Sequence, residues 1–330
     1  MKRILTIMLC AAAAVSGPVH AGYAERPEAQ AMIERLEREH DLDASKLRDL
    51  LAGAENRPHI LEAMRRPAEK VLPWHRYRRI FLGQSRIDGG IAFVREHRDL
   101  LDRAHERYGV PPHVITAIIG VETRYGGNVG RDRVIDALAT LGFDYPERAS
   151  FFLGELEHFL ILCHRERVDC AGAKGSYAGA MGWPQFIPSS YRAYAVDFDG
   201  DGRRDLWDSP ADVIGSVANY LAEHDWRAGE RVALRLSGGD APGLERSNRH
   251  TRYRYDELES AGLSADGEAP AADAAVGLVE LEGEDGPEYW AGLSNFFVIT
   301  TYNHSRMYAM AVHQLSRAIA DGLDEEMARR

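Results

Sequence analysis

The chain contains 330 residues, of which 45% are hydrophobic and 28% are charged. This composition is typical of a globular protein with room for one large domain or two to three small ones. Forty basic and 51 acidic residues give a net charge of -11, which argues against general nucleic-acid binding. Local groups, and not the overall field, would have to hold an anionic ligand.

Residues 1–21 have the features of a secretory signal peptide. Two basic residues precede a short apolar run from Ile4 to Val15, and Val19 to Ala21 fits a cleavage site. Because this run is too short to span a bilayer, we expect a periplasmic protein without a transmembrane anchor. Cys10 follows Leu9 instead of a small residue, which disfavours an outer-membrane lipid anchor.

The remaining pattern predicts a mainly helical protein with a small β-containing insertion. Helices are predicted over residues 27–70, 91–108, 114–125, 150–163, 210–224 and 305–323. Short strands are predicted over 232–236, 277–281 and 296–300, with loops over 172–188 and 237–274. We therefore expect an N-terminal helical region (22–110), a helical core (111–228), a small β-containing subdomain (229–297) and a C-terminal return to the core (298–330).

Two cysteines remain after the signal peptide, Cys163 and Cys170. In an oxidising compartment they could form a disulfide. A separation of seven residues does not fix their geometry, so a disulfide and two free thiols both stay open.

Glu122 follows an almost wholly apolar helical run, Val114 to Val121. A poorly hydrated carboxyl favours its protonated form, which is what a general acid needs to protonate a leaving oxygen. A structural glutamate paired with Arg124 fits the same pattern. Glycoside hydrolysis normally uses two carboxylates, and the surrounding motifs offer no obvious second one.

Two further segments combine small, polar and aromatic residues. The stretch from Gly175 to Tyr191 is rich in glycine, which lets backbone approach a ligand closely, and its aromatics offer flat faces to sugar rings. A well-packed turn is the alternative. In the stretch from Val298 to Ala309, Asn303 and Ser305 could either cap the following helix or belong to a groove with neighbouring tyrosines.

Residues 197–208 match the twelve-residue EF-hand loop, with a glycine at position six. This pattern predicts bound Ca²⁺. Position twelve is an aspartate instead of the longer glutamate, which reduces its reach, so Na⁺ and Mg²⁺ are alternative occupants. We predict a structural site that joins the two flanking helices. The predicted ligands are Asp197, Asp199, Asp201, the carbonyl of Arg203, Asp205 and Asp208.

These motifs, in this order, resemble the lytic murein transglycosylase B family, glycoside hydrolase family 103. The resemblance runs from about Tyr77 to Val312. It rests on Glu122 to Gly126, on Phe143 to Ala149, on the 175–191 loop, on the aspartate loop and on Tyr302 with its neighbours. It implies a lysozyme-like helical core with a helical extension, a small β-containing subdomain and one EF-hand-like loop.

The resemblance also implies an activity. Glu122 matches the catalytic acid and base, which cleaves the bond between N-acetylmuramic acid and N-acetylglucosamine and leaves a 1,6-anhydro product. No cofactor is needed for this reaction, because the sugar supplies its own nucleophile. Trp183-Pro184 departs from the smaller or more polar residues expected there. The matching substrate-binding residues are Tyr77, Ser176, Gln185, Tyr302, Asn303 and Tyr308.

The competing hypotheses are a muramidase that hydrolyses the same bond with water, an inert peptidoglycan-binding scaffold, and a calcium sensor. A single EF-hand-like loop without an apolar groove argues against the sensor. The expected partners are peptidoglycan glycan strands, with proteins of wall synthesis or remodelling as further candidates. We expect a monomer that binds no nucleic acid.

Overall fold

The computed structural model describes residues 22–65, 72–166, 168–239 and 243–328, so the predicted signal peptide lies outside the described residues. The chain divides into two compact units, residues 1–54 and 55–330. The first boundary thus falls inside the region predicted as 22–110, and the domain boundaries predicted at 110, 228 and 297 remain predictions. No helix in the described ranges is long and apolar enough to cross a membrane.

The first unit is helical. Its elements are the 3-10 helix η1 (Tyr23–Glu25), α1 (Pro27–His40) and α2 (Ala44–Ala52). Pro27 fits the first turn of α1, where its missing N–H costs no hydrogen bond. Asp43 begins α2, because its carboxylate accepts hydrogen bonds from the backbone amides of Ser45 and Lys46.

The second unit is also mainly helical. Its helices before the sheet are α3 (Pro58–Arg65), α5 (Trp74–Tyr77), η2 (Arg78–Ile80), α6 (Gln84–Glu96), α7 (Arg98–Tyr108), α8 (Pro112–Thr123), α9 (Val134–Asp144), η3 (Pro146–Arg148), α10 (Ala149–Glu166), α11 (Pro188–Tyr194) and α12 (Pro210–Glu223). Within or after the sheet lie α13 (Tyr255–Ser260), α14 (Ser294–Tyr302) and α15 (Arg306–Ala328).

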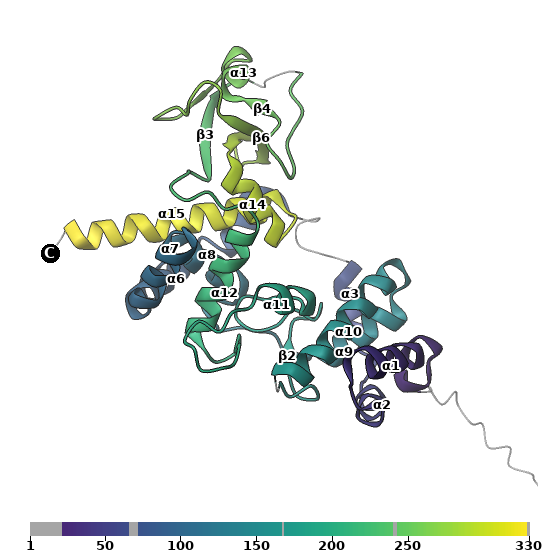
Figure 1. Ribbon diagram of the computed structural model, residues 1–330. Coiled ribbons are helices and arrows are strands. Elements are labelled where there is room, and N and C mark those ends of the chain that lie inside the picture. Colours follow the sequence, from purple (N-terminus) through teal and green to yellow (C-terminus); the bar gives the residue numbers. More distant parts are fainter. Residues whose placement is uncertain (1–21, 66–71, 167, 240–242, 329–330) are drawn as a thin grey trace, which may run out of the picture. The chain divides into compact units, whose positions relative to one another are not determined.

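Helix α8 is the central element of this unit. Residues 114–121 are all buried, which explains why the sequence is apolar on every face of the helix. Helix α15 packs along α8 and α6, and α7 packs against α12. Figure 1 shows α15 as the long yellow helix that crosses this group. The C-terminal part of the chain therefore completes the core around α8.

Two antiparallel sheets occur among the described residues. The small one pairs β1 (Asp132–Arg133) with β2 (Lys174–Gly175). The larger has the order β4-β6-β7-β3-β5, and its hydrophobic core is closed by α13. Its strands are β3 (Ala233–Gly238), β4 (Tyr253–Arg254), β5 (Leu263–Ala265), β6 (Ala275–Glu282) and β7 (Pro287–Gly292).

The predicted mainly helical fold with a small β-containing part is confirmed, but three details were wrong. Residues 296–300 lie in α14, not in a strand, since periodicity cannot separate a short buried helix from a buried strand. The helix predicted over 91–108 is two helices, because His97 has non-helical backbone angles. The predicted loop over 237–274 contains β4, α13 and β5.

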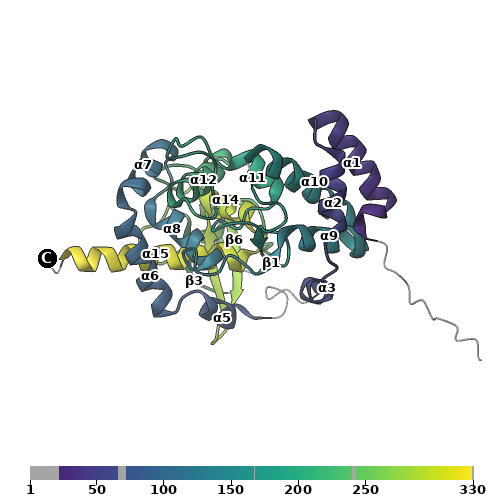
Figure 2. The same ribbon diagram turned by 90° about the horizontal axis from the view of Figure 1, so that it is seen from below.

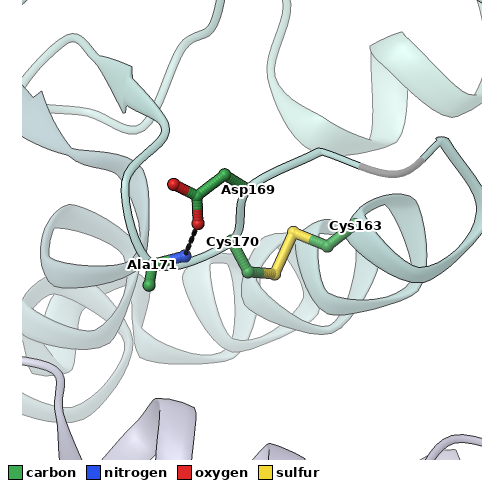
Figure 3. The surroundings of a disulfide bond; sticks show 4 residues. All are labelled: Cys163, Asp169, Cys170 and Ala171. Atoms are coloured by element: carbon green, nitrogen blue, oxygen red, sulfur yellow. Dashed lines mark hydrogen bonds between the residues drawn. A yellow bond between two sulfur atoms is a disulfide. The ribbon is translucent and has the colours of Figure 1, made fainter.

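Cys163 and Cys170 form a disulfide with a Cα–Cα distance of 5.5 Å. The bond ties the end of α10 to the segment that leads into β2 (Figure 3). In that segment the carboxylate of Asp169 accepts a hydrogen bond from the backbone amide of Ala171. Because Ser176 directly follows β2, the disulfide helps to fix where the 175–191 loop begins.

We predict that replacing both cysteines with serine lowers the melting temperature. Without the bond the unfolded chain gains entropy, which lowers the free energy of unfolding by about 2.5 kcal/mol for a loop of this length. This corresponds to a melting temperature lower by roughly 5 °C in a unit of this size. The measurement is thermal unfolding with and without reductant. The native protein should lose stability on reduction, whereas the double variant should not respond. A native melting curve unchanged by complete reduction would refute a stabilising role for the bond.

Candidate functional site

Glu122 lies in the last turn of α8, where it is half-buried between the buried Val121 and Thr123. The helix ends directly after it. Arg124, Tyr125 and Gly126 have φ values of 54°, 60° and 84°, all in the left-handed region that favours glycine. This sharp turn leads the chain away from the helix axis, so the carboxylate of Glu122 lies at a helix end and not along a packed helical face.

Tyr308 contacts Glu122 directly. The Tyr308 hydroxyl donates a hydrogen bond of 2.5 Å to Oε1 of Glu122. The ring of Tyr308 is parallel to that of Tyr302, with a centroid separation of 6.4 Å, and only 3% of Tyr308 is exposed. Residues from α8, α14 and α15, which are distant in the sequence, therefore meet around one carboxylate.

Both tyrosines remain protonated at neutral pH. Burial raises the pKa of Tyr308 well above its usual value, and the negative charge of Glu122 raises it further. The pKa of Tyr302 is raised by the same two causes in the same order. A hydroxyl that does not ionise can only donate to, or accept from, its neighbours. The Tyr308 hydroxyl is thus a stable donor to the Glu122 carboxylate.

The segment Trp183 to Gln185 connects these elements through its backbone. The Thr123 hydroxyl donates to the Trp183 carbonyl at 2.9 Å, and the Tyr302 hydroxyl donates to the Pro184 carbonyl at 2.6 Å. Gln185 has a left-handed φ of 52°, and its side-chain amide donates to the Gly182 carbonyl at 2.8 Å. The loop predicted as a binding segment is therefore bonded on both sides to the elements around Glu122.

Trp183, which departs from the family pattern, has a packing role. A Cβ added to Gly126 would lie 2.4 Å from the Trp183 ring, so the indole fills the space that glycine leaves open. A residue with a side chain at position 126 would clash with this ring, and it would also be strained by the positive φ. The large residue at 183 thus supports the turn that follows Glu122.

The other predicted site residues have defined positions. The Ser176 hydroxyl accepts the backbone amides of Ala178 and Ala180, so it closes its own turn. Asn303 ends α14, and its side chain accepts the amide of Ser305. Tyr77 in α5 is 2% exposed and raises the pKa of Tyr308. Their roles in substrate binding remain predictions.

Arg86, a buried residue of α6, was not among the site residues predicted from the sequence. Its guanidinium donates to the carbonyl of Gly120 at 2.5 Å, and the Tyr125 hydroxyl donates to the Arg86 carbonyl at 2.7 Å. Burial lowers the pKa of Arg86, and the nearby Arg124 lowers it further. Arg86 therefore fixes the end of α8 and the turn that follows it, through Gly120 and Tyr125. Its distance along the chain from Glu122 explains why no motif reveals it.

In the aspartate loop, helices α11 and α12 flank residues 197–208, as predicted. The carboxylates of Asp197 and Asp199 converge with that of Asp212, with oxygen atoms within 4.8 Å of one another. Asp201 and Asp205 are not part of this group. They accept backbone amides of Arg203 and Trp207, as Asp197 and Asp199 also accept amides of residues 200–202. Asp208 is exposed and lies outside the converging group.

Asp212 was missed because it lies four residues beyond the twelve-residue pattern, in the first turn of α12. It is 1% exposed, and it accepts the backbone amides of Phe198 and Asp205, each at 2.7 Å. Burial raises its pKa, its backbone hydrogen bonds lower it, and Asp199 and Asp197 raise it again. Three converging carboxylates fit a hard cation with oxygen ligands, because without one they repel one another.

Known proteins resemble this chain over most of its length. Residues 24–317 match the model of the transglycosylase SLT domain family. The membrane-bound lytic murein transglycosylase B of Escherichia coli is 45% identical over 308 residues, which cover 90% of this chain and 84% of that protein.

Two solved structures also resemble it. One is the Escherichia coli lytic transglycosylase SLT35 in complex with calcium, with a TM-score of 0.84 and 44% identity over 91% of this chain and 95% of that one. The other is SltB3 from Pseudomonas aeruginosa in complex with NAG-anhNAM-pentapeptide, with a TM-score of 0.78 and 32% identity over 89% and 79%. Together with the fold, these matches confirm the resemblance seen in the sequence: the chain belongs to the lytic murein transglycosylases, enzymes that act on peptidoglycan.

Proposed function

We propose that this enzyme cleaves the β-1,4 bond between N-acetylmuramic acid and N-acetylglucosamine, and that Glu122 acts first as the acid and then as the base. The observation that carries the proposal is the hydrogen bond from Tyr308 to the half-buried Glu122. The relative bound to NAG-anhNAM-pentapeptide supports the anhydro product, since that ligand contains an anhydro sugar.

The reaction needs one carboxyl group in two steps. In the first, Glu122 gives its proton to the glycosidic oxygen, the bond to the muramoyl C1 breaks, and the N-acetylglucosamine end leaves as an alcohol. In the second, the Glu122 carboxylate takes the proton of the muramoyl C6 hydroxyl, whose oxygen bonds to C1. The carboxyl is regenerated, and no water is consumed. The internal hydroxyl gains the advantage of proximity.

The neighbouring side chains position the carboxylate. The Tyr308 hydroxyl fixes the orientation of one carboxylate oxygen. Arg86 and Thr123 hold the helix end and the 183–185 segment against it. A carboxylate held in this way keeps its direction while its proton leaves and returns, which is the orientation that general acid–base catalysis requires.

We predict that Glu122→Gln lowers the rate of product release from intact sacculi by at least about 100-fold, since an amide can neither donate nor take up the proton. The variant should still fold, because glutamine keeps the size of the side chain and can accept from Tyr308. The measurement is mass spectrometry of released muropeptides. Glu106→Gln, the same change at an exposed position of α7, should release anhydro products at the native rate.

Three results would contradict the proposal. An unchanged rate in Glu122→Gln would remove Glu122 from the chemistry. Reducing-end products from the native enzyme would indicate a muramidase. A native protein that binds sacculi but releases nothing would indicate a scaffold.

We further propose a structural Ca²⁺ site at Asp197, Asp199 and Asp212, with Na⁺ and Mg²⁺ as alternative occupants and with no role in the chemistry. The convergence of the three carboxylates supports it, and a relative was solved with calcium. Because Ser209 begins α12 and its hydroxyl donates to Asp199, a bound cation would join the loop to that helix. The loop pattern in the sequence also predicted four further ligands, and these roles remain predictions: Asp201, the carbonyl of Arg203, Asp205 and Asp208.

We predict that millimolar Ca²⁺ releases measurable heat in calorimetry and raises the melting temperature. Calcium at about 100 times its Kd would stabilise the fold by about 2.7 kcal/mol. Asp199→Asn should weaken this response, because it removes one exposed ligand charge. Asp102→Asn, at an exposed position of α7, should leave it unchanged. Absence of both heat and thermal shift in the native protein would exclude the site.

We also propose that the protein is exported to the periplasm and acts there as a monomer on glycan strands, where wall-synthesis or remodelling proteins are candidate partners. The N-terminal pattern of residues 1–21 supports export. The name of the Escherichia coli relative places that protein at a membrane, in agreement with a cell-envelope location.

A further inference from the structure

A cavity of about 440 Å³ lies at the start of α8. Its walls come from the first turn of α8, from α15, from β3 and the segment that leads into it, and from Trp226. Helix α15 packs against α8, and Figure 2 shows these two helices close together. His113 in this wall and Glu122 are nine residues apart on α8, about 14 Å along the helix axis. The cavity is therefore separate from the site around Glu122.

His313 is a buried residue of α15 whose side chain lines this cavity. It is 8% exposed, and its Nδ1 atom is buried without a hydrogen-bond partner among the described residues. Burial, together with the charges of Arg317 and His113, lowers its pKa to about 4, so the ring is neutral at neutral pH. A buried polar atom without a partner is unfavourable. A ligand that accepts a hydrogen bond from this imidazole would remove that cost.

His113 adds a second imidazole to the same cavity. It is half-buried in the first turn of α8, and its side chain makes no hydrogen bond or ion pair with a residue in the described ranges. Burial lowers its pKa, and the charge of Arg317 lowers it further. Arg317 itself contacts Asp321 at 3.5 Å, but both side chains are exposed, so this ion pair is weak. One guanidinium and two imidazoles are therefore open to a ligand.

The start of α8 contributes backbone groups to this wall. No side chain caps the helix start, and Pro112 has no N–H. The backbone amide of His113 makes no hydrogen bond with another described residue. The first turn of a helix carries a partial positive charge and free N–H groups, and it attracts anions for that reason. The helix start thus favours the same kind of ligand group as the guanidinium of Arg317.

Two carboxylates also belong to the cavity wall, but both are exposed and already have partners. Glu230 contacts Arg227 at 3.5 Å, and Asp266 accepts a hydrogen bond from the hydroxyl of Ser237. Exposed charges are screened by solvent. They therefore oppose an anion less than the buried imidazole and the helix start attract it.

The two remaining arginines of the wall are engaged elsewhere. Arg235 contacts Glu288 at 2.7 Å, and Arg231 donates to the backbone carbonyl of Glu268 at 2.8 Å. The groups of this wall that are left to recognise a ligand are therefore the two histidines, Arg317 and the helix start.

The rest of the wall is apolar. The indole N–H of Trp226 already donates to the carbonyl of Gly109, at 3.2 Å, so its polar atom is satisfied. A cavity of this volume, mostly apolar and with a few convergent polar groups, is typical of a small-molecule site. It suits a ligand with one anionic end and an apolar body. The apolar lining residues are Pro111, Val114, Trp226, Val232, Ala233 and Leu234.

We propose that this cavity binds a small organic carboxylate, with its charged end at His313, His113 and the start of α8 and its aliphatic or aromatic body against the apolar wall. The inference is independent of the proposed function, because it concerns the opposite end of α8. A ligand that binds the folded protein stabilises it. Since α8 is the helix that carries Glu122, the bound carboxylate would stabilise the element on which the catalytic site is built.

The test measures the binding of hexanoate by calorimetry and by thermal unfolding, at constant ionic strength. Hexanoate should bind saturably and raise the melting temperature. Hexanamide has the same apolar body without the charge, and acetate has the charge with four fewer methylenes. Each should bind at least about tenfold more weakly, because one loses a charge-assisted hydrogen bond and the other loses apolar burial.

Two variants locate the binding site. His313→Leu and His113→Leu should each raise the Kd for hexanoate by about tenfold, as expected for the loss of one hydrogen bond to a charged group. His250→Leu is the matched control, since His250 is exposed and lies outside the cavity, and it should keep the native Kd. The half-buried His113 keeps the test decisive if the change at the buried His313 prevents folding.

Glu122→Gln should bind hexanoate as tightly as the native protein, because the cavity lies at the other end of α8. Loss of binding in that variant would place the ligand at the catalytic site and overturn the inference. The absence of saturable binding to the native protein would overturn it too. A Kd unchanged in both histidine variants, or equal affinities for hexanoate and hexanamide, would have the same consequence.

Discussion

The hydrogen bond between Tyr308 and Glu122 is the constraint on which the site depends. It joins the end of α8 to the first turn of α15 across 186 residues of sequence. The buried face of α8 and the packing of α15 along it bring the two side chains together. A carboxylate at a helix end would otherwise be free to turn toward solvent. The packing of the helical core thus determines the direction in which Glu122 can exchange a proton.

A second layer of backbone contacts holds this pair. Trp183 and Pro184 offer their carbonyls to Thr123 and Tyr302, so the loop after β2 is fixed by the helices on either side of Glu122. The disulfide at Cys163 and the aspartate loop act at the two ends of this same region, one before β2 and one before α12. Stability and site geometry are therefore linked through the same loop.

Local sequence patterns predicted those helices whose formation depends on residues close together in the sequence. The apolar run before Glu122 and the pattern of residues 210–224 predicted the helices α8 and α12, because helical periodicity acts within a few residues. Arg86 and Asp212 were not predictable, since each acts through carbonyl or amide groups brought near by folding. Residues 296–300 were misassigned because a short apolar run carries no period. The family resemblance predicted Tyr308 as a substrate-binding residue, but its hydrogen bond to Glu122 was not predicted, because that contact is formed by tertiary packing.

The most direct test of the account is the effect of Tyr308→Phe on kcat for anhydro-product formation. Loss of a hydrogen bond to a carboxylate should lower kcat by about 10- to 100-fold, with little change in KM or melting temperature. Tyr108→Phe is the control, because the Tyr108 hydroxyl is buried without a hydrogen-bond partner among the described residues, and it should keep the native kcat. A native kcat in Tyr308→Phe would contradict the claim that this tyrosine holds Glu122 for catalysis.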